Sequence, residues 1–178
     1  MKKQILLPIT TIALAAAVLL GTSFALNGAA AQRAQSEHLR ILRTILPGST
    51  DFVVEPYSGD DVNIRSVHKG ENGFVIETVT PGYADDIRMM IGVSTEGTVT
   101  GLVVLDMAET IGLGAQALTD HVFLAQLLNT SGEAAVGTNV DAITGATVTS
   151  KAIVRSVNSA ISFVTGADVD SGATSWGG

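Results

Sequence analysis

The 178-residue chain contains no cysteine and few cationic residues. Without cysteine it forms no disulfide, thiolate zinc site, iron–sulfur cluster or thioether-linked haem. Ten Lys and Arg against 17 Asp and Glu give a formal net charge of −7. Nucleic-acid binding needs clustered positive charge, so this balance argues against a nucleic-acid partner.

Histidine is also scarce. His38, His68 and His121 show no pairing at helical spacing, so we interpret them as surface or capping residues and expect no metal site. No Ser/His/Asp or paired-carboxylate pattern recurs at usable spacing, so we expect no catalytic residue. Walker-type and GxGxxG motifs are missing as well, which leaves ordinary nucleotide-binding folds without support.

One long apolar run stands near the N-terminus. Residues 5–26 carry no charge, and a membrane-spanning helix needs roughly 20 such residues. A cleaved signal peptide is the alternative, with small-residue sites at 23–25 or 29–31. The length of the run favours an uncleaved anchor over residues 1–27. Either way, we expect the rest of the chain on the extracytoplasmic side of a membrane.

The chain after the anchor has the pattern of an α+β protein. Apolar residues three and four apart predict a juxtamembrane helix over residues 28–48, ended by Pro47-Gly48. Residues 52–105 contain three or four alternating, β-branched runs with short turns, which predict an antiparallel sheet. Met89 and Met90 fall in one of these strands and are predicted core residues.

Two helices are predicted beyond the strands. The first follows Thr119 or Asp120 as its cap and ends near Asn129; the second has apolar residues at helical spacing over 150–164. We therefore expect a single domain of antiparallel sheet with packed helices over residues 49–166. The polar stretch 167–178 is predicted to be a flexible tail.

A short phrase occurs twice: "DAITGATVTS" at 141–150 and "DVDSGATS" at 168–175. The first copy stands where a loop turns into a helix. Gly145 allows close approach of a ligand, and the Thr147 and Thr149 hydroxyls with the free amides of the first turn suit a phosphate. Asp141 could orient a hydroxyl or hold a cation. The alternative is a helix N-cap made by a threonine.

The complete ten-residue phrase resembles the flavinylation motif of the FMN-binding domain family. Its members include the G subunit of Rnf electron-transport complexes and the C subunit of sodium-pumping NADH:quinone reductase. In that family a flavin transferase uses FAD to attach FMN through its phosphate to a threonine. The resemblance makes Thr147 the acceptor of a covalent FMN. The flanking motif residues implied to frame it are Asp141, Thr144, Gly145, Ala146, Thr149 and Ser150.

Residues 82–114 carry a second resemblance, to a strand pair and a Glu-Thr-x-Gly-Leu-Gly loop of the same family. Two departures concern the shape of these loops: Ile111 replaces a usual proline, and "ADDI" after Tyr83 replaces a glycine-rich turn. The loop residues implied to lie by the flavin are Glu109, Thr110, Gly112, Leu113 and Gly114.

The second copy lacks a following helix and flanking strands. It would make Thr174 a second acceptor only if the transferase reads a flexible peptide. We interpret it as a chance match, because a flavin on a tail would lack a shielding pocket.

The resemblance implies a membrane-anchored electron carrier, most similar to the G subunit of an Rnf-type complex. Such a complex couples electron flow between ferredoxin and NAD to movement of Na⁺ or H⁺, and this subunit is not catalytic alone. The implied partners are the other membrane subunits and, during maturation, the flavin transferase. Two alternatives stay open: a free-standing extracytoplasmic flavin carrier, and a non-redox anchored binding domain in which "TGAT" only caps a helix.

Overall fold

The computed structural model describes residues 32–33, 35–106 and 120–167. The chain separates into two units, residues 1–40 and 41–178. In the first, residues 35–40 are helical, and Arg40 forms an exposed ion pair with Glu37 at 2.6 Å. No helix of the described part is long and apolar enough to cross a membrane. The predicted anchor and the second Gly-Ala-Thr copy lie outside the described residues.

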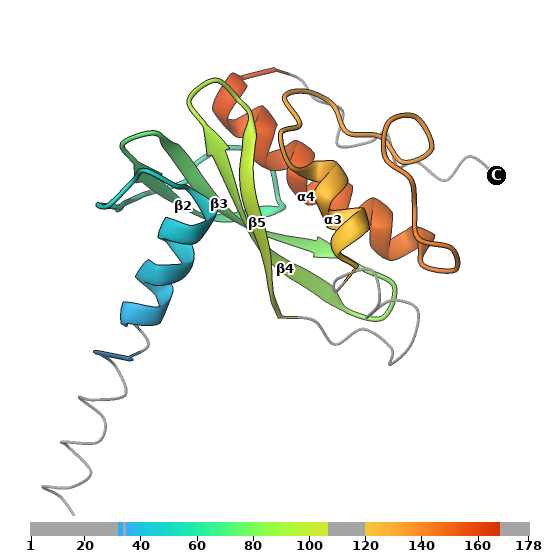
Figure 1. Cartoon of the computed structure of the whole chain (residues 1–178), viewed down its shortest axis with the longest axis horizontal. Helices are drawn as coiled ribbons and strands as arrows, with labels where there is room; N and C mark the ends of the chain where they lie inside the picture. The colour runs from blue at the N-terminus through green and yellow to red at the C-terminus, as the bar shows by residue number, and fades with distance from the viewer. Residues whose placement is uncertain (1–31, 34, 107–119, 168–178) are drawn as a thin grey trace, which may run out of the picture. The chain divides into compact units, whose positions relative to one another are not determined.

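The second unit contains a five-stranded antiparallel meander whose spatial order is the chain order (Figure 1). This confirms the predicted antiparallel sheet, with five strands instead of three or four. The added strand is the short β1, whose valines lie at the exposed sheet edge. The strands are β1 (Val53–Glu55), β2 (Ile64–Gly70), β3 (Gly73–Pro81), β4 (Asp86–Ser94) and β5 (Val99–Asp106).

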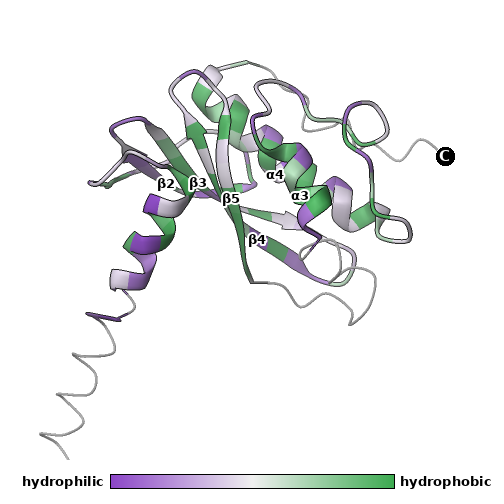
Figure 2. Cartoon of the chain, in the orientation of Figure 1, coloured by the Kyte–Doolittle hydropathy of each residue, from purple (hydrophilic) through white to green (hydrophobic). Residues whose placement is uncertain are grey.

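One face of the sheet, called the inner face here, packs against α3 (His121–Leu127) and α4 (Thr147–Thr165). Strand side chains alternate between faces, so Ile76 of β3 and its register partner Ile91 of β4 both point inward. Apolar residues follow the strands and one side of α4 in Figure 2. Met89 is fully buried in this core and Met90 is 2% exposed on the opposite face, which confirms their predicted burial.

The opposite face receives the helical residues 41–45, whose last turn lies on two glycines. A Cβ on Gly92 or Gly101 would come within 2.5 or 2.7 Å of the Ile45 carbonyl oxygen. The Thr100 hydroxyl donates to the same oxygen at 2.7 Å. Glycine is therefore required here for the close approach of backbone to sheet.

Both later helices were predicted, with different limits. Asp120 caps α3 by accepting hydrogen bonds from the Val122 and Phe123 amides at 2.9 and 3.1 Å, so Asp120 and not Thr119 is the cap. The helix ends at Leu127, and Asn129 follows with a left-handed φ of 61°. The second helix, α4, starts at Thr147, before the predicted apolar pattern, and Gly166 ends it with φ 66°.

Candidate functional site

A tight turn presents the first Gly-Ala-Thr copy at the start of α4. The Ala146 amide donates to the Ile143 carbonyl at 2.9 Å, and Gly145 has φ 81°, as the third residue of a type II turn requires. The Ser150 hydroxyl donates to the Ala146 carbonyl at 2.9 Å and accepts from the Ile143 amide at 3.3 Å. Gly145 and Ser150 thus fix the turn.

The first turn of α4 leaves its backbone donors open. The N-cap residue is Ala146, which makes no side-chain capping bond, so the alternative of a threonine cap is wrong. The first helical bond runs from the Ser150 amide to the Ala146 carbonyl at 2.9 Å. Within the described residues, the amides of Thr147, Val148 and Thr149 donate no hydrogen bond. No acidic residue stands in this turn, so the helix dipole favours an added anion.

The four hydroxyl groups of the motif differ in accessibility. Thr144 and Thr147 are exposed, whereas Thr149 is 1% exposed and Ser150 is fully buried. The Thr147 and Thr149 hydroxyls therefore do not face the same ligand position, because residues two apart on a helix face different sides. Of these four residues, Thr147 is the one that is exposed and lines the cavity described next.

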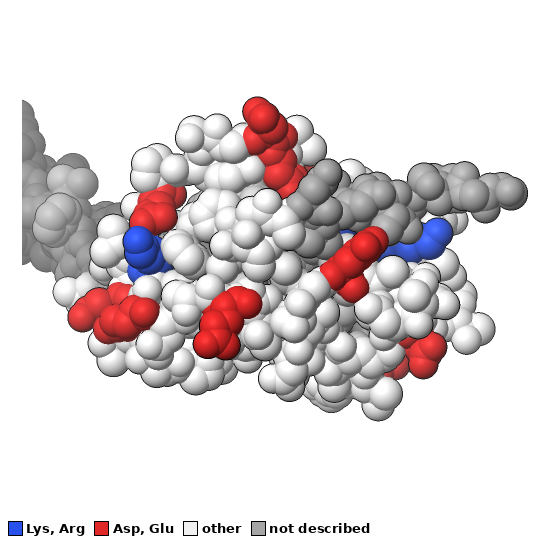
Figure 3. All heavy atoms as spheres, turned by 90° about the horizontal axis from the view of Figure 1, so that it is seen from above, with Lys and Arg blue, Asp and Glu red and all other residues white. Residues whose placement is uncertain are grey.

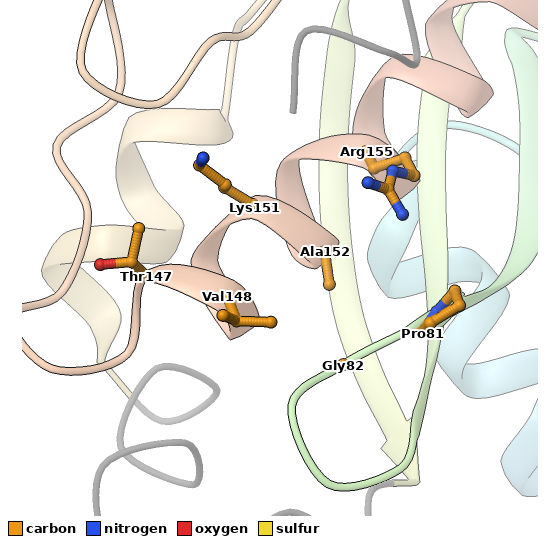
Figure 4. A pocket seen from close by; sticks show the side chains of 7 residues that line it. All are labelled: Pro81, Gly82, Thr147, Val148, Lys151, Ala152 and Arg155. Carbon is orange, nitrogen blue, oxygen red and sulfur yellow. The ribbon is translucent and has the colours of Figure 1, made fainter. Parts of the chain in front are cut away.

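The cavity lies between the first half of α4 and the end of β3, with a volume of about 320 Å³. Thr147, Lys151 and Arg155 follow one another at four-residue steps along α4. Figure 4 shows Thr147 and Lys151 on one side of the helix, and Val148 and Ala152 toward the turn after β3. The residues lining it are Pro81, Gly82, Thr147, Val148, Lys151, Ala152 and Arg155.

Two cations line this cavity in an acidic protein. Figure 3 shows acidic side chains spread over the face seen there, with only isolated Lys or Arg. Lys151 and Arg155 are half-buried, and the described lining contains no carboxylate. Neither cation was predicted from the sequence, although their spacing of four and eight residues from Thr147 placed them on one helix face. The cavity is therefore locally suited to an anionic ligand.

Asp141 is positioned from α3, apart from the cavity. Gln126 of α3 accepts from the Asp141 amide at 2.9 Å and donates to the Asp141 carbonyl at 3.4 Å. Asp141 is exposed and does not line the cavity. The two hydrogen bonds with Gln126 thus hold the first residue of the motif at the surface. Sequence reasoning missed Gln126, for which no motif exists.

The second predicted group, Glu109, Thr110, Gly112, Leu113 and Gly114, lies outside the described residues. The end of β5, which precedes this group in the chain, is described. The last residue of β5, Asp106, pairs in register with Arg88 near the start of β4, and Asp86 of β4 pairs with Pro81. The chain therefore leaves β5 at the same end of the sheet as the cavity. In the described ranges, no group of three or more His, Asp or Glu residues could hold a metal ion.

Comparison with known proteins identifies the family of this domain. Residues 82–162, which run from the cavity turn through most of α4, match the FMN-binding domain family. The chain is 30% identical to the G subunit of the ion-translocating oxidoreductase complex of Methanosarcina acetivorans, over 90% of this chain and 93% of that protein. This match covers nearly the whole length of both.

Two further relatives match this chain over shorter regions. The G subunit of the Na⁺-translocating ferredoxin:NAD⁺ oxidoreductase complex of Acetobacterium woodii is 36% identical over 50% of this chain and 47% of that protein. The G subunit of the proton-translocating ferredoxin:NAD⁺ oxidoreductase complex of Clostridium ljungdahlii is 32% identical over 52% and 53%. The match thus spans about half the length of these two relatives.

The family match identifies this α+β domain as an FMN-binding domain. The chain belongs to the FMN-binding domain family, in the group that includes these G subunits.

Proposed function

We propose that this protein is the electron-transferring G subunit of an Rnf-type ion-translocating complex and carries FMN esterified to Thr147. Support for FMN comes from the family match, and support for the complex comes from the G-subunit relatives. The observation that carries the attachment point is the accessibility of Thr147. It is the one hydroxyl of the motif that is both exposed and beside the cationic cavity.

The residues around the cavity fit a phosphate-linked flavin. The open amides of Val148 and Thr149 and the start of the helix dipole lie where the phosphate ester would form. Lys151 adds a positive charge one turn further along α4, and Val148 and Ala152 supply an apolar wall. When bound, FMN would supply reversible electron transfer, while the protein tethers it and sets its electrostatic surroundings.

Covalent attachment of FMN would require an enzyme that recognises the motif. In the proposed reaction the Thr147 hydroxyl oxygen bonds to the FMN phosphorus of FAD, the pyrophosphate bond breaks, and AMP leaves. The hydroxyl proton passes to a base of the flavin transferase. Asp141, Thr144 and Gly145 are exposed beside the acceptor, which suits recognition by that enzyme.

A second part of the proposal concerns the loop at residues 109–114. Glu109, Thr110, Gly112, Leu113 and Gly114 are proposed to lie by the flavin, because the chain leaves β5 at the cavity end of the sheet. We further propose that residues 1–27 anchor the domain on the extracytoplasmic side of a cell membrane, beside the other subunits of the complex. The uncharged run at 5–26 supports this placement.

The experiment is complementation of a strain that lacks this subunit, with ferredoxin:NAD⁺ oxidoreductase activity measured in its membranes. We expect wild type and Thr95→Ala to restore activity and Thr147→Ala to leave it at the level of the deletion. Thr95 is a matched control, because it is an exposed threonine between β4 and β5, at the opposite end of the sheet. Full activity of Thr147→Ala would refute the proposed role of that residue.

A further inference from the structure

The cavity beside α4 has two chemically different ends. Thr147 and Lys151 lie at one end, and Arg155 lies at the other, on the side of Pro81, the last residue of β3 (Figure 4). Val148 and Ala152 form the wall between them. A ligand that fills this cavity from Thr147 therefore meets a cation, an apolar surface and a second cation in that order.

The geometry of α4 gives the distances between these groups along the helix axis. With a rise of about 1.5 Å per residue, Lys151 and Arg155 lie about 6 and 12 Å from Thr147 along the axis. A phosphate esterified to Thr147 falls within reach of the Lys151 side chain. The ribityl chain of FMN separates the ring from the phosphate, so a ring directed along α4 from Thr147 would lie nearer to Arg155.

We propose that the flavin lies along α4 in this cavity, with Lys151 paired to the phosphodiester and Arg155 facing the ring. Arg155 then acts as a positioning residue that raises the reduction potential. The inference rests on the proposed attachment of FMN to Thr147. It goes further by assigning separate roles to two residues outside the Gly-Ala-Thr motif.

The charge balance gives the direction of the effect. When an external reductant delivers two electrons and the ring takes up one proton, the reduced ring carries one negative charge. The guanidinium of Arg155 stabilises this charged form more than the neutral oxidised ring. The described lining contains no carboxylate; Asp85 and Asp86 belong to the same hairpin but lie outside the lining.

The test is a potentiometric titration of the full-length holoprotein with dithionite, after intact mass has shown the flavin content of each variant. We expect Arg155→Gln to lower the midpoint potential by about 30 mV, a tenfold change in the equilibrium of a two-electron couple. Lys151→Gln should change that equilibrium less than threefold, because the Lys151 ammonium group pairs with the phosphodiester and not with the flavin ring. Arg155→Lys keeps the charge and should stay within threefold of wild type.

Lys69→Gln is the matched control for loss of one positive charge. Lys69 pairs in register with Phe74, at the end of β3 opposite Pro81, and should leave the potential unchanged. Arg155→Met, a second neutral variant, should reproduce the shift of Arg155→Gln. Flavin-loaded Arg155 variants with the wild-type potential, or an equal shift in Lys69→Gln, would overturn this inference alone. Wild-type protein without covalent flavin would instead overturn the proposed function and this inference with it.

Discussion

The two sides of α4 differ in their surroundings: one packs in the core and the other lines the cavity. One side buries Ile153, Val157 and Ile161 against the inner face of the sheet, where the Ser156 and Thr80 hydroxyls also hydrogen-bond at 2.8 Å. The other side presents Thr147, Lys151 and Arg155 to the cavity. Because one rigid helix carries both sets, the core fixes where the chemical groups stand. Changes on the core side should lower stability, and changes on the cavity side should alter flavin binding without unfolding the domain.

The largest loss of stability is expected from Ile153→Ala. Ile153 is fully buried, so its truncation leaves a cavity under α4 and should cost about 3 kcal/mol of unfolding free energy. Urea denaturation measures this. The folded fraction should still accept flavin, since Thr147 and its turn are untouched. A variant of wild-type stability would show that the α4 core does not support the fold as described.

A smaller loss is expected from Asn158→Ala. The Asn158 side chain is buried, donates to the Ala134 carbonyl and accepts from the Ala134 amide, both at 2.9 Å. Its removal leaves two backbone groups unpaired away from water and should cost about 2 kcal/mol, measured by the same urea denaturation.

Asn139 offers the matched control for this prediction. It makes the same kind of pair to the backbone of Glu133 and Ala135, at 2.9 and 2.7 Å, but it is exposed. Water can replace those bonds, so Asn139→Ala should cost less than about 1 kcal/mol. Equal losses for the two variants would show that burial does not set the difference.

A still smaller effect should come from Glu77, which lies on the face of the sheet away from α4. Burial raises the pKa of its carboxyl group, but hydrogen bonds from Arg88 at 2.7 Å and Ser66 at 2.8 Å, with the charges of Arg88 and His68, outweigh this and lower the pKa below its usual value. The carboxylate therefore stabilises the folded state above the unfolded pKa of about 4.3, and this contribution is lost as pH falls through the folded pKa.

Glu77→Gln tests that effect. It should cost about 1 kcal/mol at pH 7, because a partly exposed ion pair contributes modestly. The difference from wild type should shrink below pH 4, and flavin content should not change. Urea denaturation at several pH values measures this. A difference that is the same at pH 7 and pH 3 would contradict the assignment.

Much of the fold could be predicted, because strands and helix starts are marked by patterns of neighbouring residues in the sequence. Alternation of apolar residues marks strands such as β3 and β4, and Asp120 marks the start of α3. The apolar pattern of α4 begins only at residue 150, since the first turn from Thr147 has no apolar pattern and no capping side chain. The domain limits 49–166 and the roles of the motif residues remain predictions.

The candidate site could be predicted only in part. The motif singles out Thr147 as the acceptor, but it also included Thr149 as a cofactor-binding residue, because a sequence does not show that the helix turns that hydroxyl into the core. Lys151 and Arg155 have no motif of their own. They matter because folding brings Pro81 and Gly82 of a distant hairpin against their side of α4. Contacts between residues so far apart in the chain depend on tertiary packing, so the sequence pattern did not predict them.

The most direct test of the central claim is the intact mass of the full-length protein coexpressed with a flavin transferase. The wild type, Thr147→Ala and Thr174→Ala should be compared. We predict one added FMN in the wild type and in Thr174→Ala and none in Thr147→Ala, which should retain wild-type stability. Flavin retained by Thr147→Ala, or no added mass in the wild type, would contradict the assignment of Thr147 as the attachment point.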